Sequence, residues 1–224
     1  MKFDNRLFLH QEVMLLSLKD KKGTVERGAY YRPAIGAAIL AELLLSGRVE
    51  IEREKKKEFV RVINDKRLDD PLLDECLRRI QTSKKRQRLR TWVSRFANTK
   101  NLLHRVATGL CRLGVLRLAE DKVLLVFKRR VYPEIDPKPE KEIVARLKKA
   151  ISGSGLVDPR TVTLIAIAHG TNLLKNALEK KELKERKERI KSITSGDSMG
   201  KAAKEIVQAA QAAAAMVVIT TTTT

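Results

Sequence analysis

The segment from Ile35 to Ser46 constrains the fold more than any other part of the sequence, because it is apolar on nearly every side of a helix. A helix of this kind is stable only when other elements surround it, so the pattern predicts a helix buried at the centre of the fold. Its one charge, Glu42, must then have a partner or reach the helix edge. Gly47 is a natural stop for this helix.

Several other segments repeat apolar residues every three or four positions, which predicts amphipathic helices. Aromatic residues make up only 4% of the chain, and this favours helix-on-helix packing over a β-sandwich. The sequence therefore predicts a mainly α fold. Further helices are expected over Leu7–Leu18, from Asp69-Asp70-Pro71 to Ile80, from about Ser83 to Phe96, and over Asn101–Leu113, Glu140–Ile151 and Thr161–Leu178. The Lys/Glu-rich segment that follows, up to about Lys191, and the Ala-rich segment Ala202–Ile219 are also expected to be helical.

One or two short β-hairpins are expected beside the helices. Val49–Ile63 alternates apolar and charged residues around a basic cluster, which predicts a hairpin exposed on one face. A second hairpin is expected from Val115–Leu118 and Val123–Phe127, with Glu120-Asp121-Lys122 as its turn. Thr24–Pro33 is expected to be a loop.

No feature of the sequence indicates catalysis or a bound metal. The three histidines, His10, His104 and His169, have no Cys, Asp or Glu at metal-ligand spacing and are interpreted as packed or capping residues. There is no nucleophile elbow, Walker loop or dinucleotide fingerprint. Cys76 and Cys111 lie in apolar helical patterns and are interpreted as two buried thiols in a reducing compartment. We expect a protein that is not an enzyme and needs no cofactor.

The absence of a secretory signal and of about 20 consecutive apolar residues predicts a cytosolic protein or one peripheral to a membrane. The chain carries 47 Lys and Arg against 27 Asp and Glu, a net charge of +20, which implies an anionic partner. From Cys76 to Ala119 there is no acid at all. A solvated helix face normally mixes signs, so this acid-free window predicts a binding surface. Its cations are Arg78, Arg79, Lys84, Lys85, Arg86, Arg88, Arg90, Arg95, Lys100, Arg105, Arg112 and Arg117.

Six blocks of sequence carry a resemblance that runs along nearly the whole chain. They are LFLHQEVMLLSLKDKKGT (Leu7–Thr24), AAILAELLLSGRVEI (Ala37–Ile51), DDPLLDECLRRI (Asp69–Ile80), TWVSRFAN (Thr91–Asn98), LCRLGVLRLAEDKVLLVF (Leu110–Phe127) and VDPRTVTLIAIAHGTNLLKNAL (Val157–Leu178). In order and spacing they resemble the Golgi phosphoprotein 3 family, peripheral membrane proteins that recognise phosphatidylinositol 4-phosphate. The chain looks most like the compact bacterial members.

The resemblance implies one domain over residues 1–224, with 219–224 as a frayed tail, and a helical bundle core ringed by amphipathic helices. It implies binding to anionic membrane lipids on the cytoplasmic face of a membrane, the Golgi in a eukaryote or the inner membrane in a bacterium. Cytoplasmic tails of membrane proteins are further expected partners. The second hairpin is associated with self-association into a homo-oligomer, and its exposed edge offers unpaired backbone groups. The residues expected there are Leu118, Val123 and Leu125.

The headgroup residues of the family carry over only in part. By resemblance, Arg27 stands where the family's pocket has a tryptophan, and Gly36, Lys100 and Leu103 stand where it has arginines, so that Lys100 alone keeps the family's charge. Nearby cations could rebuild the anion site, since arginine binds phosphate bidentately and lysine as a point charge. The residues expected to form it are Arg27, Arg32, Lys100 and Arg105.

Tyr30 and Tyr31 are expected either to contact the membrane interface or to pack the loop on its own protein.

Two other partners stay open for the acid-free window. Asn101–Arg130, a helix followed by a hairpin with basic flanks, locally resembles a winged helix, in which Arg105 and Arg112 would contact DNA and Lys122 would lie at the wing tip. An acidic protein tail is the other alternative.

Overall fold

The computed structural model describes residues 6–19, 23–25, 30–55, 57–123, 127–196, 204 and 206–208, and over these residues the fold is mainly α. The helices are α1 (Leu9–Ser17), α2 (Tyr31–Leu45), α3 (Pro71–Gln81), α4 (Leu89–Ala97), α5 (Leu102–Arg112), α6 (Lys138–Ser152), α7 (Pro159–Gly170), α8 (Leu174–Ala177), α9 (Lys180–Glu185) and α10 (Lys187–Ser195). Three antiparallel strand pairs accompany them: β1 (Leu18–Lys19) with β2 (Thr24–Val25), β3 (Val49–Glu54) with β4 (Lys57–Val62), and β5 (Ala119–Val123) with β6 (Phe127–Val131).

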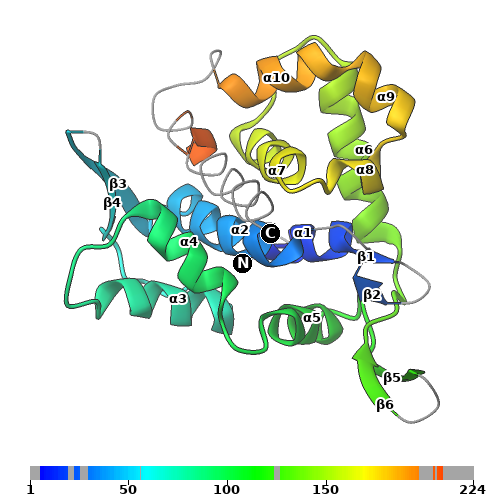
Figure 1. The fold of residues 1–224 in the computed structure, drawn as a ribbon, viewed down its shortest axis with the longest axis horizontal. Coiled ribbons are helices and arrows are strands. Elements are labelled where there is room, and N and C mark those ends of the chain that lie inside the picture. Colours follow the sequence, from blue (N-terminus) through cyan, green and yellow to red (C-terminus); the bar gives the residue numbers. More distant parts are fainter. Residues whose placement is uncertain are drawn as a thin grey trace, which may run out of the picture.

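Helix α2 lies at the centre of the molecule, as its all-round apolar sequence predicts. Every residue from Ala34 to Leu43 is buried, and α2 packs against α1, α4 and α7. Helices α3, α4 and α5 lie on one side of the α1–α2 pair, and α6 to α10 lie on the other (Figure 1). One hydrophobic cluster joins both sides, because it contains residues from Leu9 in α1 to Ile193 in α10.

Helices α2 and α4 touch at the level of the backbone. A Cβ added to Gly36 would lie 2.6 Å from the carbonyl oxygen of Val93 and 2.9 Å from the amide nitrogen of Ala97. Only glycine therefore fits at this crossing. The contact also places the first half of α2 beside the C-terminal end of α4.

Buried carboxylates connect helices that are far apart in the sequence. Glu42 accepts a hydrogen bond from the Leu9 backbone N–H at 2.6 Å and pairs with Arg160 of α7 at 2.8 Å, which supplies the partner that its burial requires. Glu12 of α1 pairs with Arg146 of α6 at 2.8 Å and lies 3.8 Å from the same Arg160. Burial raises the pKa of Glu12, and the two arginines oppose this shift. This network ties α1, α2, α6 and α7 together.

Two helices begin at two of the three Asp-Pro pairs in the sequence. The Asp70 carboxylate accepts the backbone N–H groups of Leu72 and Leu73 at 3.0 and 2.9 Å, and the following proline starts α3. Asp158 caps α7 in the same way, by accepting the Thr161 N–H at 3.0 Å. Both starts follow the preference for Asp at the cap and Pro at the first helical position.

The first predicted hairpin is confirmed, and the second one has a different register. Strands β3 and β4 pair from Val49 opposite Val62 to Glu54 opposite Lys57. In the second pair Ala119 lies opposite Val131, so Glu120-Asp121-Lys122 belongs to strand β5 and the predicted turn there is wrong. Glu120 and Asp121 lie opposite Arg130 and Arg129 on β6, and Asp121 forms an ion pair with Arg129 at 2.7 Å, whereas Lys122 lies opposite Lys128. Cross-strand charge pairing explains why the two acids occupy a strand here.

Other boundaries also differ from the sequence prediction. Tyr31, Arg32 and Pro33 form the first turn of α2 instead of a loop. The helix expected near Ser83 begins at Leu89, because the preceding residues bond to the first hairpin: the Val60 N–H donates to the Gln87 carbonyl at 3.2 Å. The helix expected over Thr161–Leu178 is interrupted between α7 and α8, where Asn172 has a φ of 60°.

The described residues contain no helix that is long and apolar enough to cross a membrane. Cys76 is buried as predicted, whereas Cys111 is only partly buried, because it lies near the end of α5 where the helix leaves the core; both are free thiols. Of the predicted Ala-rich last helix, only positions 204 and 206–208 are described, and they are helical. The tail at 219–224 lies outside the described residues.

Candidate anion-binding surface

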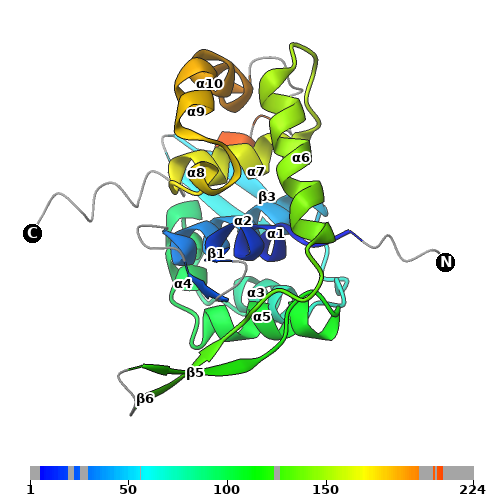
Figure 2. The same cartoon turned by 90° about the vertical axis from the view of Figure 1, so that its right-hand side faces the viewer.

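The acid-free window folds into one layer of the molecule. It begins within α3, continues through α4 and α5, and ends at the start of β5. Both views of the ribbon show α3 and α5 beneath the α1–α2 pair, with α4 beside α2 and away from α6 to α10 (Figures 1 and 2). We call these three helices and their connections the α3–α5 layer.

Few cations of this layer are neutralised by acids. Arg86 pairs with Glu52 at 3.2 Å and with Glu54 at 2.5 Å, and Arg105 pairs with Glu75 at 2.6 Å. For the other ten cations of the window, no ion pair occurs among the described residues. Nine of these ten are exposed: Arg78, Lys84, Lys85, Arg88, Arg90, Arg95, Lys100, Arg112 and Arg117.

Some of the arginines are oriented by the aromatic residues beneath them. The Arg95 guanidinium lies 5.0 Å from the Trp92 ring centroid, and that of Arg79 lies 5.8 Å from the ring of Phe96. Arg79 also donates to the Thr99 hydroxyl at 3.0 Å, which connects α3 to the segment after α4. Stacking of this kind holds the guanidinium plane while leaving its charge available to an anion.

The four residues predicted to form an anion site do not all come together. Arg27 lies outside the described residues. Arg32, half-buried in the first turn of α2, and Lys100, exposed after α4, lie at the same end of the α2–α4 pair, because Gly36 packs against Ala97. Figure 1 shows this end of α4 leading directly into α5.

Arg105 is turned toward α3. Its ion pair with Glu75 lowers the pKa of that carboxyl, chiefly through the hydrogen bond from the guanidinium. The pair joins α5 to α3 and occupies one of the two Nη atoms of Arg105. Arg105 therefore belongs to the contact between α3 and α5, and not to the end of the α2–α4 pair where Arg32 and Lys100 lie.

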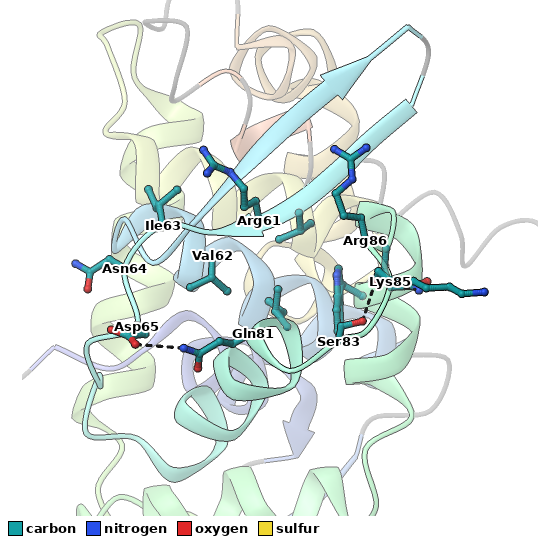
Figure 3. Close-up of a pocket in the computed structure, with 13 residues that line it drawn as sticks. Arg61, Val62, Ile63, Asn64, Asp65, Gln81, Ser83, Lys85 and Arg86 are labelled. Atoms are coloured by element: carbon teal, nitrogen blue, oxygen red, sulfur yellow. Dashed lines mark hydrogen bonds between the residues drawn. The ribbon is translucent and has the colours of Figure 1, made fainter.

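A cavity of about 680 Å³ lies at the other end of α4, between β4, the end of α3 and residues 83–87. Figure 3 shows Val62 and Ile63 on one wall and Gln81 and Ser83 on the other. None of the three described members of the predicted anion site, Arg32, Lys100 and Arg105, lines it. Two of its arginines are already neutralised, Arg61 by Glu50 and Arg86 by hairpin carboxylates, so its charge is nearly balanced. We do not assign the headgroup site to this cavity.

Comparison with known proteins connects this architecture to a family. The family model of Golgi phosphoprotein 3 (GPP34) matches residues 9–210. The chain belongs to the Golgi phosphoprotein 3 family. It is similar to vacuolar protein sorting-associated protein 74 of Schizosaccharomyces pombe, with 27% identity over 210 residues that cover 78% of this chain. The aligned part spans only 61% of that relative's length.

Two positions that the sequence resemblance matches to the family's pocket, Gly36 and Leu103, lie at packed helix surfaces in this member of the Golgi phosphoprotein 3 family. At Gly36 no side chain fits against α4, so a charged residue there would require the two helices to move apart. Leu103 is half-buried on α5 and packs against the core cluster. Both positions serve helix packing in this chain.

The remaining predicted contacts are placed only in part. Tyr30 is 37% exposed, and its backbone N–H donates to the Thr171 carbonyl at 3.4 Å, while Tyr31 is half-buried against the core cluster. Leu118, before β5, is 54% exposed. The backbone of Val123 lies in β5, and Leu125 lies outside the described residues. Membrane contact and self-association through these residues both stay predictions.

Within the described part of the chain, no group of three or more His, Cys, Asp or Glu side chains could hold a metal ion. The prediction that the protein needs no metal stays untested by this observation.

Sequence reasoning also missed a polar cluster around His10, which it interpreted as a packed histidine. The signal that could have revealed it is a histidine within the first helix, every residue of which is buried.

Proposed function

We propose that this Golgi phosphoprotein 3 family member is a peripheral membrane protein whose α3–α5 layer docks on anionic phospholipid headgroups. The observation that supports this proposal most directly is the set of ten cations in that layer without an ion pair among the described residues. A Lys or Arg near an anionic leaflet contributes about 1 kcal/mol. Half of these cations acting together would therefore hold the protein on a membrane.

Arg32 and Lys100 are the proposed headgroup contacts within this surface. They lie at one end of the α2–α4 pair, and Arg27 precedes the same end of α2 in the sequence. A guanidinium binds a phosphate with two parallel hydrogen bonds, and an ammonium adds a point charge. Family membership makes phosphatidylinositol 4-phosphate the headgroup to test first.

The name of the S. pombe relative, a vacuolar protein sorting-associated protein, supports a role in membrane trafficking. We propose that the chain works as an adaptor that binds cytoplasmic tails of membrane proteins on the cytoplasmic face of a membrane. That membrane is the Golgi in a eukaryote or the inner membrane in a bacterium. No catalytic step is part of the proposal.

Vesicle co-sedimentation tests the proposal with two variants and one matched control. Arg32→Gln/Lys100→Gln removes the proposed headgroup contacts, and Arg78→Gln/Arg90→Gln/Arg95→Gln removes three exposed cations of the layer. The control, Lys180→Gln/Lys184→Gln/Lys187→Gln, removes three exposed cations from α9 and α10 on the other side of the molecule. Neutral vesicles, vesicles with phosphatidylserine and vesicles with phosphatidylinositol 4-phosphate are compared.

The layer variant is expected to lose roughly tenfold or more in binding to every anionic vesicle, while the control keeps most of it. The headgroup variant is expected to lose the preference for phosphatidylinositol 4-phosphate over phosphatidylserine. Equal losses in the layer variant and the control would show that the layer has no special role. No pelleting of the unsubstituted protein would contradict membrane docking and leave DNA, through α5 and the β5–β6 hairpin, or an acidic protein tail.

A further inference from the structure

The outer edge of strand β4, which faces away from β3, is paired over only part of its length. The Val60 N–H donates to the Gln87 carbonyl at 3.2 Å, and Phe59 forms an antiparallel bridge with Arg88. The residues before α4 therefore run alongside the middle of β4 like a short third strand. This pairing does not extend to the end of β4.

The backbone of Val62 faces the part of the edge that is left open. The next residue, Ile63, donates its N–H to the Arg48 carbonyl at 3.0 Å, on the β3 side of the hairpin. Successive backbone groups of a strand point to alternate edges, so the N–H and C=O of Val62 point to the outer edge. In continued register Val62 would lie opposite Lys85, but the Lys85 carbonyl accepts the Ser83 hydroxyl at 2.8 Å instead. No described residue forms a backbone hydrogen bond with Val62 on this edge.

The cavity of about 680 Å³ opens where the pairing stops, between β4 and residues 83–87. Its two walls are joined past the end of β4 by the hydrogen bond from Gln81 Nε2 to Asp65 Oδ2 at 3.2 Å (Figure 3). Two core residues, Ile80 and Trp92, contribute to its lining, and Ile63 is 50% exposed beside it. An unpaired strand edge next to apolar lining is the arrangement by which sheets accept an added strand.

The charges around the cavity favour an occupant with acidic residues. The lining arginines, Arg61 and Arg86, are paired with carboxylates of β3, and Asp65 is bonded to Gln81. The lysines beside the cavity are different: Lys66, Lys84 and Lys85 are exposed, and the described residues offer none of them an ion pair. Lys85 lines the cavity, and the other two adjoin lining residues in the chain.

We propose that the outer edge of β4 binds an extended, acidic segment of a partner protein as an added strand. The N–H and C=O of Val62 pair with the backbone of that segment. Its apolar side chains enter the cavity at alternate positions, and its acidic residues meet the three lysines. This inference rests on the adaptor part of the proposed function, because its partner is a protein segment, and it is independent of membrane docking.

Fluorescence anisotropy of the full chain with short labelled peptides tests the proposal at physiological salt. The probe alternates valine and threonine and is flanked by glutamates. A second peptide has lysines in place of the glutamates, and a third is N-methylated along its backbone, which removes the N–H groups that pair with a strand edge. We expect the glutamate-flanked probe to bind and each of the other two to bind about fivefold or more weakly.

Charge reversal at the rim tests where the probe binds. Lys84→Glu/Lys85→Glu changes two exposed residues, so the fold should be kept, and the glutamate-flanked probe should bind about fivefold or more weakly while the lysine-flanked one gains. Arg112→Glu/Arg117→Glu is the matched control, because it makes the same change of charge at exposed positions of the α3–α5 layer that do not line the cavity. It should keep the original order of the two peptides. The same reversal of order in both variants would overturn the proposal.

Hydrogen exchange observed by NMR tests the strand pairing directly. Bound probe should slow exchange of the Val62 amide, whereas the Ile63 amide, already bonded to Arg48, should change little. Unchanged exchange at Val62 with the probe bound, or equal binding by the N-methylated peptide, would overturn strand addition. No binding of the glutamate-flanked probe would overturn the site as a whole.

Vesicle pelleting without peptide separates this inference from membrane docking. Normal pelleting without peptide binding would mean that the β4 edge fails while docking stands. Peptide binding without pelleting would mean the reverse.

Discussion

The buried carboxylates of Glu12 and Glu42 are held by arginines that come from distant parts of the chain. Glu42 on the central helix is 5% exposed and bonds both to Arg160 and to the backbone of α1. A buried ion pair adds little net stability compared with apolar residues, but breaking it by removing one partner is costly. These residues therefore determine which helices pack together, and they add comparatively little to the total stability.

The substitution Glu42→Gln is expected to lower the free energy of unfolding by about 3 kcal/mol, because it leaves the charge of half-buried Arg160 with less compensation. Urea unfolding followed by circular dichroism measures this loss. The control is Glu185→Gln, which removes an exposed carboxylate 4.0 Å from Lys181 and should leave the midpoint unchanged. A midpoint for Glu42→Gln equal to that of the control would mean that the pair carries no structural role.

Replacement of Gly36 by alanine is expected to destabilise the fold by about 2 kcal/mol, because the added methyl group overlaps the backbone of α4. Gly155→Ala is the matched control, since an added Cβ there meets no atom within 4 Å. Thermal unfolding of the two variants measures the difference. A Gly36→Ala protein as stable as the control would show that α2 and α4 can separate at little cost.

At the scale of elements, the α3–α5 layer is held together by a few side chains that bridge its helices. Glu75 of α3 pairs with Arg105 of α5, and Arg79 of α3 bonds to Thr99 after α4. Apolar residues of all three helices belong to the shared core cluster. The layer is therefore fixed on its inner face by packing and between its helices by arginine contacts.

The Glu75–Arg105 pair predicts how stability depends on pH. The pKa of Glu75 is lower in the folded state than in the unfolded state, so its contribution is complete above the ordinary glutamate pKa of about 4.3 and is lost as the pH falls through the lowered value. Glu75→Gln should reduce the acid-induced loss of stability in that range. Urea midpoints from about pH 6 to pH 3 measure the slope. A slope identical to that of the unsubstituted protein would contradict this assignment.

Self-association through the β5–β6 hairpin stays a prediction at this scale. Leu118 is exposed at the base of the hairpin, and a hairpin edge leaves backbone groups unpaired. If copies of the chain associate there, deletion of residues 118–124 should lower the sedimentation mass toward that of one chain. Leu156→Gln, a change at another highly exposed leucine, should leave the mass unaltered. An unchanged mass after the deletion would exclude the hairpin as the contact.

Local sequence patterns predicted most elements, and the errors have identifiable causes. The stripe in α3 and the apolar run in α2 were correct because burial follows helical periodicity directly. Glu120-Asp121-Lys122 resembled a turn, but cross-strand partners on β6 make these residues a strand. The sequence indicated that Glu42 needs a partner, but not that the partner is Arg160, because the two residues are 118 positions apart. In the same way, the sequence shows which cations the α3–α5 layer carries but not which of them lie near one another, because that depends on contacts between distant residues.

At the scale of the whole molecule, charge is distributed unequally between the two sides of the central helices. The side formed by α6 to α10 mixes Lys and Glu, with pairs such as Lys148 with Glu182. The α3–α5 layer carries cations with few acidic partners. A molecule of this kind would orient in the field of an anionic surface before any specific contact forms.

Vesicle binding by the unsubstituted protein is therefore expected to fall as salt rises. The Debye length shortens from about 30 Å at 0.01 M to about 8 Å at 0.15 M ionic strength, which removes the long-range part of the attraction. Co-sedimentation with phosphatidylserine vesicles over this range measures the slope. The layer variant with three arginines removed should show a shallower slope than the α9–α10 control. Equal slopes would assign the attraction to the net charge alone.

The carboxylate network has a further consequence for how the protein is made. Glu42 leaves the ribosome 118 residues before Arg160 does. At roughly 5–20 residues per second, the central helix waits roughly 6–24 s for the side chain that neutralises it. During that interval α2 cannot bury its carboxylate beside the arginine, so the nascent chain holds its most apolar helix without α7, one of the helices that pack on it. We expect this stretch of synthesis to be the period in which a chaperone is most needed.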